Sequence, residues 1–278
     1  MPTPYQIGWF TTGRDKAARD LFVAVQTAIR RREMDAETAF VFCNRDPGVA
    51  METNLLFRLV NACNLPFVSI SFKKFREAVG GEKKASSSLP AWRLEYDRNV
   101  MKALEVFKPQ ICVLAGYMLI TGPELCTKYD MVNLHPAAPG GPSGTWQEVI
   151  WKLIEQDATE TGVMMHLVTP ELDKGPAVMY CTFSIRGEPL DSLWAQVKGK
   201  TAARLKKEEG ENNALFRAIR QQGFAREIPL IVSTLKSFAQ GKVKITADKK
   251  VMDVEGKAVN GYNLTAEIDR QVGKAPAR

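Results

Sequence analysis

One short stretch of this sequence brings an amide and an imidazole close together. Asn133 and His135 occur in the run NLHP, directly after the apolar residues Met131 and Val132. On a strand, residues i and i+2 point to the same face, so the two polar side chains are expected to project together. Pro136 then removes a backbone donor and turns the chain out of the sheet. An amide beside an imidazole can stabilise an oxyanion that develops in a transition state.

A carboxylate further along the chain completes the candidate group. Asp173 lies in the segment TPELDKG, a loop bounded by proline and glycine. A carboxylate near an imidazole favours its charged form and fixes its orientation. Structural interpretations compete, because an Asn-x-His pair on a strand is more commonly structural and an aspartate before Lys-Gly commonly forms a turn. The spacing alone leaves both interpretations open.

Apolar runs that alternate with helical patterns must position these side chains. Runs of β-forming residues predict strands at 5–10, 39–44, 66–72, 110–115 and 131–134. Helical spacing predicts helices at 16–31, 51–64, 93–107 and 144–156. This order predicts an α/β fold, a mostly parallel sheet with helices on both faces. Asn133 and His135 then stand at the carboxyl end of a parallel strand, where such sheets place ligand sites.

The pattern changes in the second half of the chain. Residues 163–168 and 177–185 predict two strands whose short connecting loop indicates antiparallel pairing. A long charged helix is expected at 190–222, and an amphipathic helix at 228–240 that ends at Gly241. This half is therefore expected to carry mainly helices after its two strands.

The remaining segments predict smaller features. Alternating patterns at 242–246 and 250–254 indicate a terminal β-hairpin, and residues 272–278 are expected to form a frayed tail. The Gly/Ser/Lys-rich residues 80–90 predict a loop.

Length and composition set limits on the class of protein. The 278 residues, 45% apolar and 25% charged, suit one large soluble globular domain or one domain with an appendage. We expect a catalytic domain at 1–187, with 188–278 forming a helical insertion and a C-terminal helix-hairpin extension packed on the same domain. No apolar run approaches the roughly 18 residues of a membrane span, and no secretory leader is recognisable. A cytoplasmic location without membrane contact is therefore expected.

Cysteine usage and charge narrow the partners. The five cysteines include no C-x-x-C pair, which predicts reduced, buried thiols and no zinc site. The net charge of +7 suits anionic substrates. Because the basic residues are scattered beside acids, as in RLKKEEGE, nucleic acid is not an expected partner.

The longer context of these motifs resembles a known enzyme family. The stretches LAGYM, NLHP and TGVMMHLVTPELDKGP resemble the formyltransferases that use 10-formyltetrahydrofolate, with most similarity to glycinamide ribonucleotide formyltransferases of purine synthesis. The segments RLEYDRNVMKALEVFKPQICVLAGYM and IPLIVSTLKSFAQGKVKI are also similar, so the resemblance covers most of the chain. It implies a Rossmann-like formyltransferase fold with C-terminal helices and a small hairpin. Residues 80–90 and 188–224 look like additions.

The resemblance also implies roles for individual residues. Asn133 would donate to the formyl oxygen, His135 would stabilise the oxyanion and assist proton movement, and Asp173 would hold the histidine and organise a water. His166 is expected to be a core or pocket-wall residue. The reaction needs 10-formyltetrahydrofolate as co-substrate and no metal. The folate-binding residues implied are Met118, Leu119, Ile120, Val168, Thr169, Glu171 and Leu172, and at Leu119 relatives often carry arginine.

The acceptor side departs from the family pattern. The family's phosphate loop, G-x-G-S-N, is replaced here by TTGRDKA, in which only Gly13 keeps its place. Arg14 and Lys16 could bind a phosphate by charge instead, or they could be solvated surface residues. The family's substrate-contacting acid, which precedes the last long helix, falls near Phe224 here and not on a glutamate.

Three hypotheses for the acceptor and activity stay open. The chain could act on glycinamide ribonucleotide, or on another amine such as an amino-sugar nucleotide or a modified nucleotide. It could also bind folate without turnover, although the intact Asn133, His135 and Asp173 argue against this. All three predict small-molecule partners and a monomer or homodimer.

Overall fold

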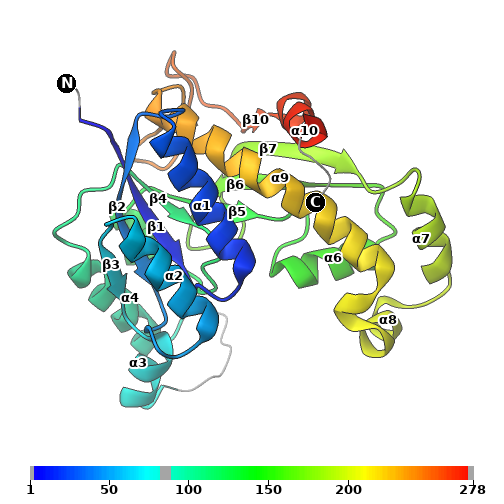
Figure 1. Ribbon diagram of the computed structural model, residues 1–278, viewed down its shortest axis with the longest axis horizontal. Helices are drawn as coiled ribbons and strands as arrows, with labels where there is room; N and C mark the ends of the chain where they lie inside the picture. The colour runs from blue at the N-terminus through cyan, green and yellow to red at the C-terminus, as the bar shows by residue number, and fades with distance from the viewer. Residues whose placement is uncertain (1–2, 82–88, 275–278) are drawn as a thin grey trace.

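The computed structural model describes residues 3–81 and 89–274 of the chain (Figure 1). Within these residues one large sheet begins with parallel strands β1 (Tyr5–Thr11), β2 (Ala36–Cys43), β3 (Phe67–Ser69), β4 (Ile111–Leu114) and β5 (Met131–His135). The sheet is completed by β6 (Glu160–Leu167), β7 (Ala177–Ser184) and β10 (Tyr262–Asn263). The strand order is β10-β7-β6-β5-β4-β1-β2-β3. Because β6 runs antiparallel to β5 and β7, the predicted mostly parallel sheet with a local antiparallel pair is confirmed.

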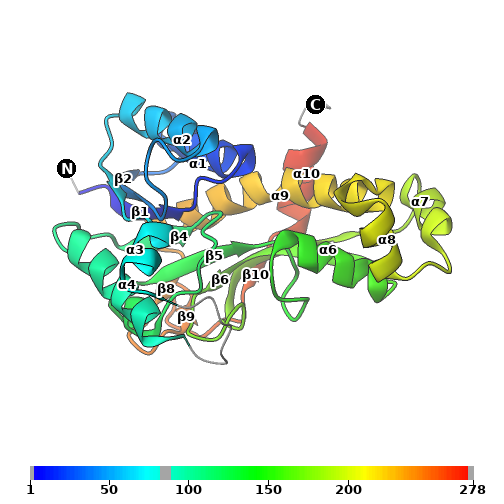
Figure 2. The same cartoon turned by 90° about the horizontal axis from the view of Figure 1, so that it is seen from below.

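Helices cover both faces of this sheet, as predicted (Figure 2). The first six are α1 (Lys16–Arg30), α2 (Met51–Ala62), α3 (Phe72–Ala78), α4 (Ala91–Ala103), α5 (Pro123–Lys128) and α6 (Trp146–Glu155). The later ones are α7 (Leu190–Val197), α8 (Ala202–Glu208), a 3-10 turn (Gly210–Asn212), α9 (Ala214–Ala239) and α10 (Thr265–Lys274). In Figure 2, α1, α2, α9 and α10 lie on one side of the sheet, and α3 and α4 on the other.

The central strand β1 shows why the sheet is buried on both faces. Trp9 and Phe10 point to opposite sides, and both are fully buried. Trp9 packs edge-on against Phe22 of α1 at 5.5 Å, whereas Phe10 packs against Phe40 and Tyr117 in a second core. Continuous apolar strands of this kind are typical of parallel sheets covered on both faces.

The order of the strands creates a crevice at one edge. From β1 the chain moves outward to β2 and β3, then returns to β4 and β5 on the other side of β1. Ligands bind at such a reversal, outside the carboxyl ends of the strands. Two bonds join the loops there: Thr12 N–H donates to Gly116 O at 3.0 Å, and Thr12 Oγ1 accepts from Met118 N–H at 2.9 Å.

A buried ion pair supports the loop that follows β4. Arg93 and Asp97, on α4, are 3% and 1% exposed and lie 2.5 Å apart. Arg93 also donates to Ile120 O at 2.6 Å, and Asp97 accepts from Gly122 N–H at 2.7 Å. The pair therefore fixes the backbone of the segment expected to contact folate.

Several expected elements have different limits in the structure. The strand expected at 66–72 stops at Ser69, because Ser71 caps α3 by accepting a bond from Lys74 N–H. The helix expected at 190–222 is wrong as a single element, since Gly199 and Gly210 take positive φ values of 77° and 57° between shorter helices.

The prediction of a separate helix at 228–240 is also wrong. Helix α9 runs continuously through Pro229, which lacks a backbone donor, because Ile219 and Leu230 on either side are buried in the core. The expected frayed tail is wrong for 272–274, which belong to α10, and its last four residues lie outside the described part of the chain.

The smaller features give mixed results. The terminal hairpin is confirmed as β8 (Lys244–Ile245) paired with β9 (Val251–Met252). Helices α3, α5 and α10 and strand β10 were not expected. Most of the loop expected at 80–90 lies outside the described residues. No helix in the described part of the chain is long and apolar enough to span a membrane.

Candidate active site

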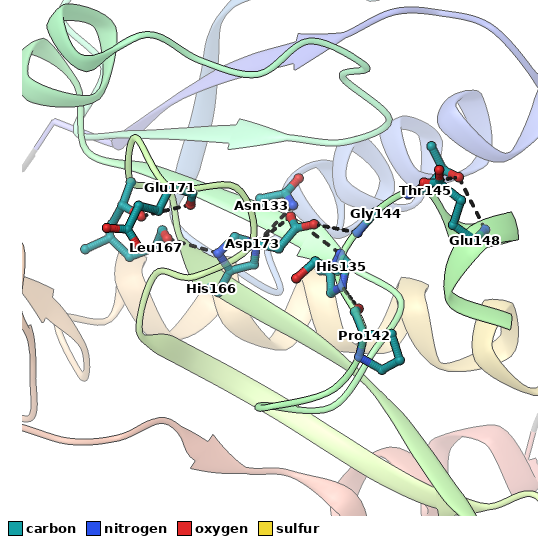
Figure 3. Close-up of polar contacts among 12 residues, drawn as sticks. Asn133, His135, Pro142, Gly144, Thr145, Glu148, His166, Leu167, Glu171 and Asp173 are labelled. Carbon is teal, nitrogen blue, oxygen red and sulfur yellow. Dashed lines mark hydrogen bonds and ion pairs between the residues drawn. The ribbon is translucent and has the colours of Figure 1, made fainter. Parts of the chain in front are cut away.

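The antiparallel pairing of β5 and β6 sets Asn133 directly opposite His166 (Figure 3). The two side chains meet at 3.0 Å between Asn133 Nδ2 and His166 Nε2. His166 Nδ1 lies 3.0 Å from Leu167 O, which can only accept, so Nδ1 carries the proton in the neutral ring. Nε2 is then the acceptor for one amide N–H of Asn133. This bond fixes the orientation of the amide and leaves its second N–H for another acceptor.

His135 is held between a carbonyl and a carboxylate. Its Nε2 lies 2.9 Å from Pro142 O, so Nε2 carries the proton in the neutral ring. Its Nδ1 lies 3.6 Å from Asp173 Oδ1, which is longer than a hydrogen bond. The side chain is only 3% exposed. A proton that arrives at Nδ1 would therefore produce an imidazolium with an acceptor near each nitrogen.

Asp173 both forms a turn and faces the two histidines. Its φ of 54° lies in the left-handed region, which aspartate tolerates better than most residues. Gly144 N–H donates to its Oδ2 at 2.9 Å, and its Oδ1 is 3.6 Å from His166 Nε2 as well as from His135. The turn and the catalytic interpretations of Asp173 are thus compatible.

A tight return of the chain positions this loop. A Cβ on Gly175 would lie 1.7 Å from Leu167 O, so only glycine fits at this position. The close approach brings the end of the loop back against the end of β6.

The electrostatics of the site favour a neutral imidazole next to a carboxylate. Burial lowers the pKa of His135, although the Asp173 charge and the bond to Pro142 O oppose this. Burial raises the pKa of Asp173, but the nearby His166 and His135 rings and the bond from Gly144 N–H outweigh it, so that pKa lies below its usual value. Near neutral pH the carboxyl group is therefore ionised and His135 is uncharged.

The side chains of Asn133, His135, His166 and Asp173 line a cavity of about 310 Å³. Three apolar side chains on its walls stay exposed: Met118 at 38%, Ile120 at 41% and Leu172 at 48%. Exposed apolar side chains that gather in one cleft are typical of a ligand site. The expected folate residues that line it are Met118, Leu119, Ile120, Val168, Thr169 and Leu172. Glu171 is exposed and does not line this cavity.

The expected acceptor residues are separated. Arg14 lines the first cavity, whereas Lys16 lines a neighbouring one. Gly13 lines neither, and its N–H donates to Thr11 Oγ1 at 3.2 Å. Asp15 caps α1 by accepting from Ala18 N–H at 3.0 Å, so a carboxylate already occupies the helix end that would attract an anion.

Two residues of α9 also line the first cavity, although neither was among the expected site residues. Arg220 and Glu227 form an ion pair, and Glu227 is only 6% exposed. They stand seven residues apart, two turns along one helix face, a spacing that could have indicated the pair if α9 had been expected as one helix. His166 was expected only in the core or pocket wall, yet it contacts Asn133.

The family model described as formyl transferase matches residues 16–200, which is more than half of the chain. This protein therefore belongs to the formyl transferase family, whose members use 10-formyltetrahydrofolate.

Individual relatives are consistent with this membership. The chain is 25% identical over 173 residues to phosphoribosylglycinamide formyltransferase of Escherichia coli, a match that covers 61% of this chain and 68% of the relative. It is 30% identical over 133 residues to the Saccharomyces cerevisiae enzyme of the same name, covering 45% and 61%. The structure of phosphoribosylglycinamide formyltransferase from Coxiella burnetii shares the fold, with a TM-score of 0.65 at 20% identity over 94% of this chain and 99% of that one.

Proposed function

We propose that this protein transfers a formyl group from 10-formyltetrahydrofolate to phosphoribosylglycinamide in purine synthesis. The observation that carries the proposal is the convergence of Asn133, His135 and Asp173 on one apolar-walled cavity. The names of the relatives from Escherichia coli and Saccharomyces cerevisiae support the choice of acceptor.

The cavity suits a folate co-substrate. Met118, Ile120 and Leu172 offer exposed apolar surface that a planar ring system can cover. The backbone at Ile120 and Gly122 is fixed by the Arg93–Asp97 pair, so this wall is already ordered before a ligand binds. The folate supplies the formyl group and receives a proton at N10 when the carbon–nitrogen bond breaks.

Asn133 is the proposed donor to the formyl oxygen. One of its N–H groups is used by His166, and the second is available to an oxygen that gains negative charge. Since the bond to His166 orients the amide in advance, little reorganisation is needed during the reaction. Loss of one such donor typically lowers kcat by about 10²–10³.

His135 is the proposed proton acceptor. As the amine nitrogen bonds to the formyl carbon it must lose a proton, and the unprotonated Nδ1 of His135 can take it. The imidazolium that forms would donate to Pro142 O and lie beside the Asp173 carboxylate. The proton then passes to N10 of the folate, directly or through water, which balances the reaction and restores the neutral ring.

A different amine is the second candidate acceptor, although the names of the relatives favour phosphoribosylglycinamide. The Asp15 carboxylate caps α1 where the family binds the phosphate of its acceptor. An amino-sugar nucleotide or another modified nucleotide would be an alternative substrate for the same chemistry. A protein that only binds folate is disfavoured, because His135 keeps both its bond to Pro142 O and the Asp173 charge beside its Nδ1.

A cytoplasmic location is part of the same proposal. All five cysteines are free thiols, which is typical of proteins from reducing compartments.

Incubation with 10-formyltetrahydrofolate and a panel of amines tests the function. We expect mass spectrometry to detect a formyl adduct of phosphoribosylglycinamide together with stoichiometric tetrahydrofolate. An adduct on a different amine would support the second candidate. Release of formate without any adduct would show that water is the acceptor and would contradict both.

A further inference from the structure

A second cavity of about 620 Å³ lies beside the first. The two share Ala17, Trp146 and Arg220, so they are direct neighbours. Most residues that line the second cavity belong to residues 188–224, the segment that looked like an addition to the family pattern. From this segment the 3-10 turn and the first part of α9 line the cavity.

Arg220 is fixed at the junction of the two cavities. Its guanidinium lies over the Trp146 ring at 4.8 Å and over the Phe224 ring at 5.0 Å. Glu227 holds it by an ion pair, and the side chain is 20% exposed. A guanidinium that is held in this way loses little conformational entropy when it binds an anion, and its fork of N–H donors matches the oxygens of phosphate.

A further cation in the second cavity has no carboxylate partner among the residues that the structure describes. Lys16 is paired with Asp20 at 2.6 Å. Arg217 lies one turn before Arg220 on α9, is exposed, and forms no ion pair within residues 3–81 and 89–274. Asp20 and Glu211 also line this cavity, and Asp20 is paired with Lys16. Glu227 offsets part of the charge of Arg220, so Arg217 supplies the uncompensated cation and the remaining N–H groups of Arg220 supply further donors from the adjacent turn of the helix.

The residues at the start of α1 are less suited to bind an anion. At the start of α1, the Asp15 carboxylate takes the N–H of Ala18, and the N–H of Gly13 is bonded to Thr11. Arg14 lies 4.0 Å from the Asp15 carboxylate, which partly compensates its charge. Negative charge at a helix N-terminus opposes binding of a second negative group.

We propose that the second cavity binds the phosphate group of the acceptor through Arg217 and Arg220. The amine of the same molecule then extends past Trp146 into the first cavity, beside His135. The inference rests on the proposed formyl transfer and goes beyond it, because it assigns acceptor binding to the 188–224 segment and defines the acceptor as a phosphorylated amine that spans both cavities.

The test compares an acceptor with and without its phosphate. KM is measured for phosphoribosylglycinamide and for the corresponding dephosphorylated riboside, in the parent and in the Arg217→Ala and Arg14→Ala variants. We expect Arg217→Ala to reduce the preference for the phosphorylated acceptor, the ratio of the two KM values, by about 10-fold, because a hydrogen-bonded contact to a charged group is lost. Lys207→Ala, which removes an exposed charge of α8 outside both cavities, is the matched control.

The outcomes separate this inference from the proposed function. An unchanged ratio in Arg217→Ala would overturn the inference, as would a loss of preference in Arg14→Ala alone. If the parent transfers formyl to neither acceptor, the proposed function fails, and calorimetry with ribose 5-phosphate then decides the inference separately. If the parent binds ribose 5-phosphate and Arg217→Ala binds it more weakly, the inference is supported. If the two proteins bind it equally, or if the parent does not bind it, the inference is refuted.

Discussion

Replacing Asp173 by asparagine tests the electrostatic design of the site. The substitution keeps the size of the side chain and leaves an oxygen that can still accept from Gly144 N–H. It removes the negative charge that lies 3.6 Å from His135 Nδ1. The loop is therefore expected to keep its conformation while the proposed imidazolium loses its counter-charge.

The size of the effect follows from this distance. Two unit charges 3.6 Å apart attract each other by about 5 kcal/mol at an effective dielectric constant of about 20. Part of this is already offset by desolvation of the buried groups, so a loss of about 3 kcal/mol is expected. Such a loss in the transition state corresponds to a decrease of about 10²-fold in kcat.

The pH profile supplies a second, independent readout. Burial lowers the pKa of His135 and Asp173 opposes this, so removing the carboxylate lowers that pKa further. If the neutral ring accepts the proton, the acid limb of kcat/KM follows protonation of His135. In the Asp173→Asn variant this limb is expected to move to lower pH, while the plateau falls.

Steady-state kinetics from pH 4 to 9 measure both effects. Glu171→Gln is the matched control, since it neutralises an exposed carboxylate of the same loop that does not line the cavity. Parental kcat in Asp173→Asn, or an acid limb that moves to higher pH, would refute the assignment of His135 as a proton acceptor supported by Asp173.

Three further substitutions test other parts of the structure. Asn133→Ala should lower kcat by about 10²–10³ with little change in folate affinity, and parental turnover would exclude it as the oxyanion donor. Arg93→Met should lower the free energy of unfolding by about 3–5 kcal/mol, measured in urea, because Asp97 is left buried without its partner. Gly175→Ala should yield little folded protein, since its Cβ would meet Leu167 O at 1.7 Å, and a well-folded variant would contradict that geometry.

The sequence predicted those parts of the site that depend on local periodicity. Asn133 and His135 could be placed on one strand end because side chains alternate along a strand. Asp173 required the family resemblance, since an aspartate before Lys-Gly is compatible with an ordinary turn.

The contacts that the sequence did not predict depend on long-range pairing. His166 reaches Asn133 only because β6 pairs with β5 in one particular register. Arg220 and Glu227 reach the cavity because α9 continues through Pro229 and packs on β6 and β7, which overrides the local tendency of proline to interrupt a helix. The strand at 66–72 was too long because a short apolar run does not reveal where a serine cap begins the next helix.

The register of β6 has a consequence for how this part of the gene can change. Substitutions among the buried residues of β6 alter packing locally, but the loss or gain of one codon within it would turn His166 to the opposite face of the sheet. The amide of Asn133 would lose its partner although every individual residue type was retained. Selection for turnover should therefore tolerate replacements within residues 163–165 far better than changes in length, and a deletion scan through β6 should abolish activity even at positions where alanine is accepted.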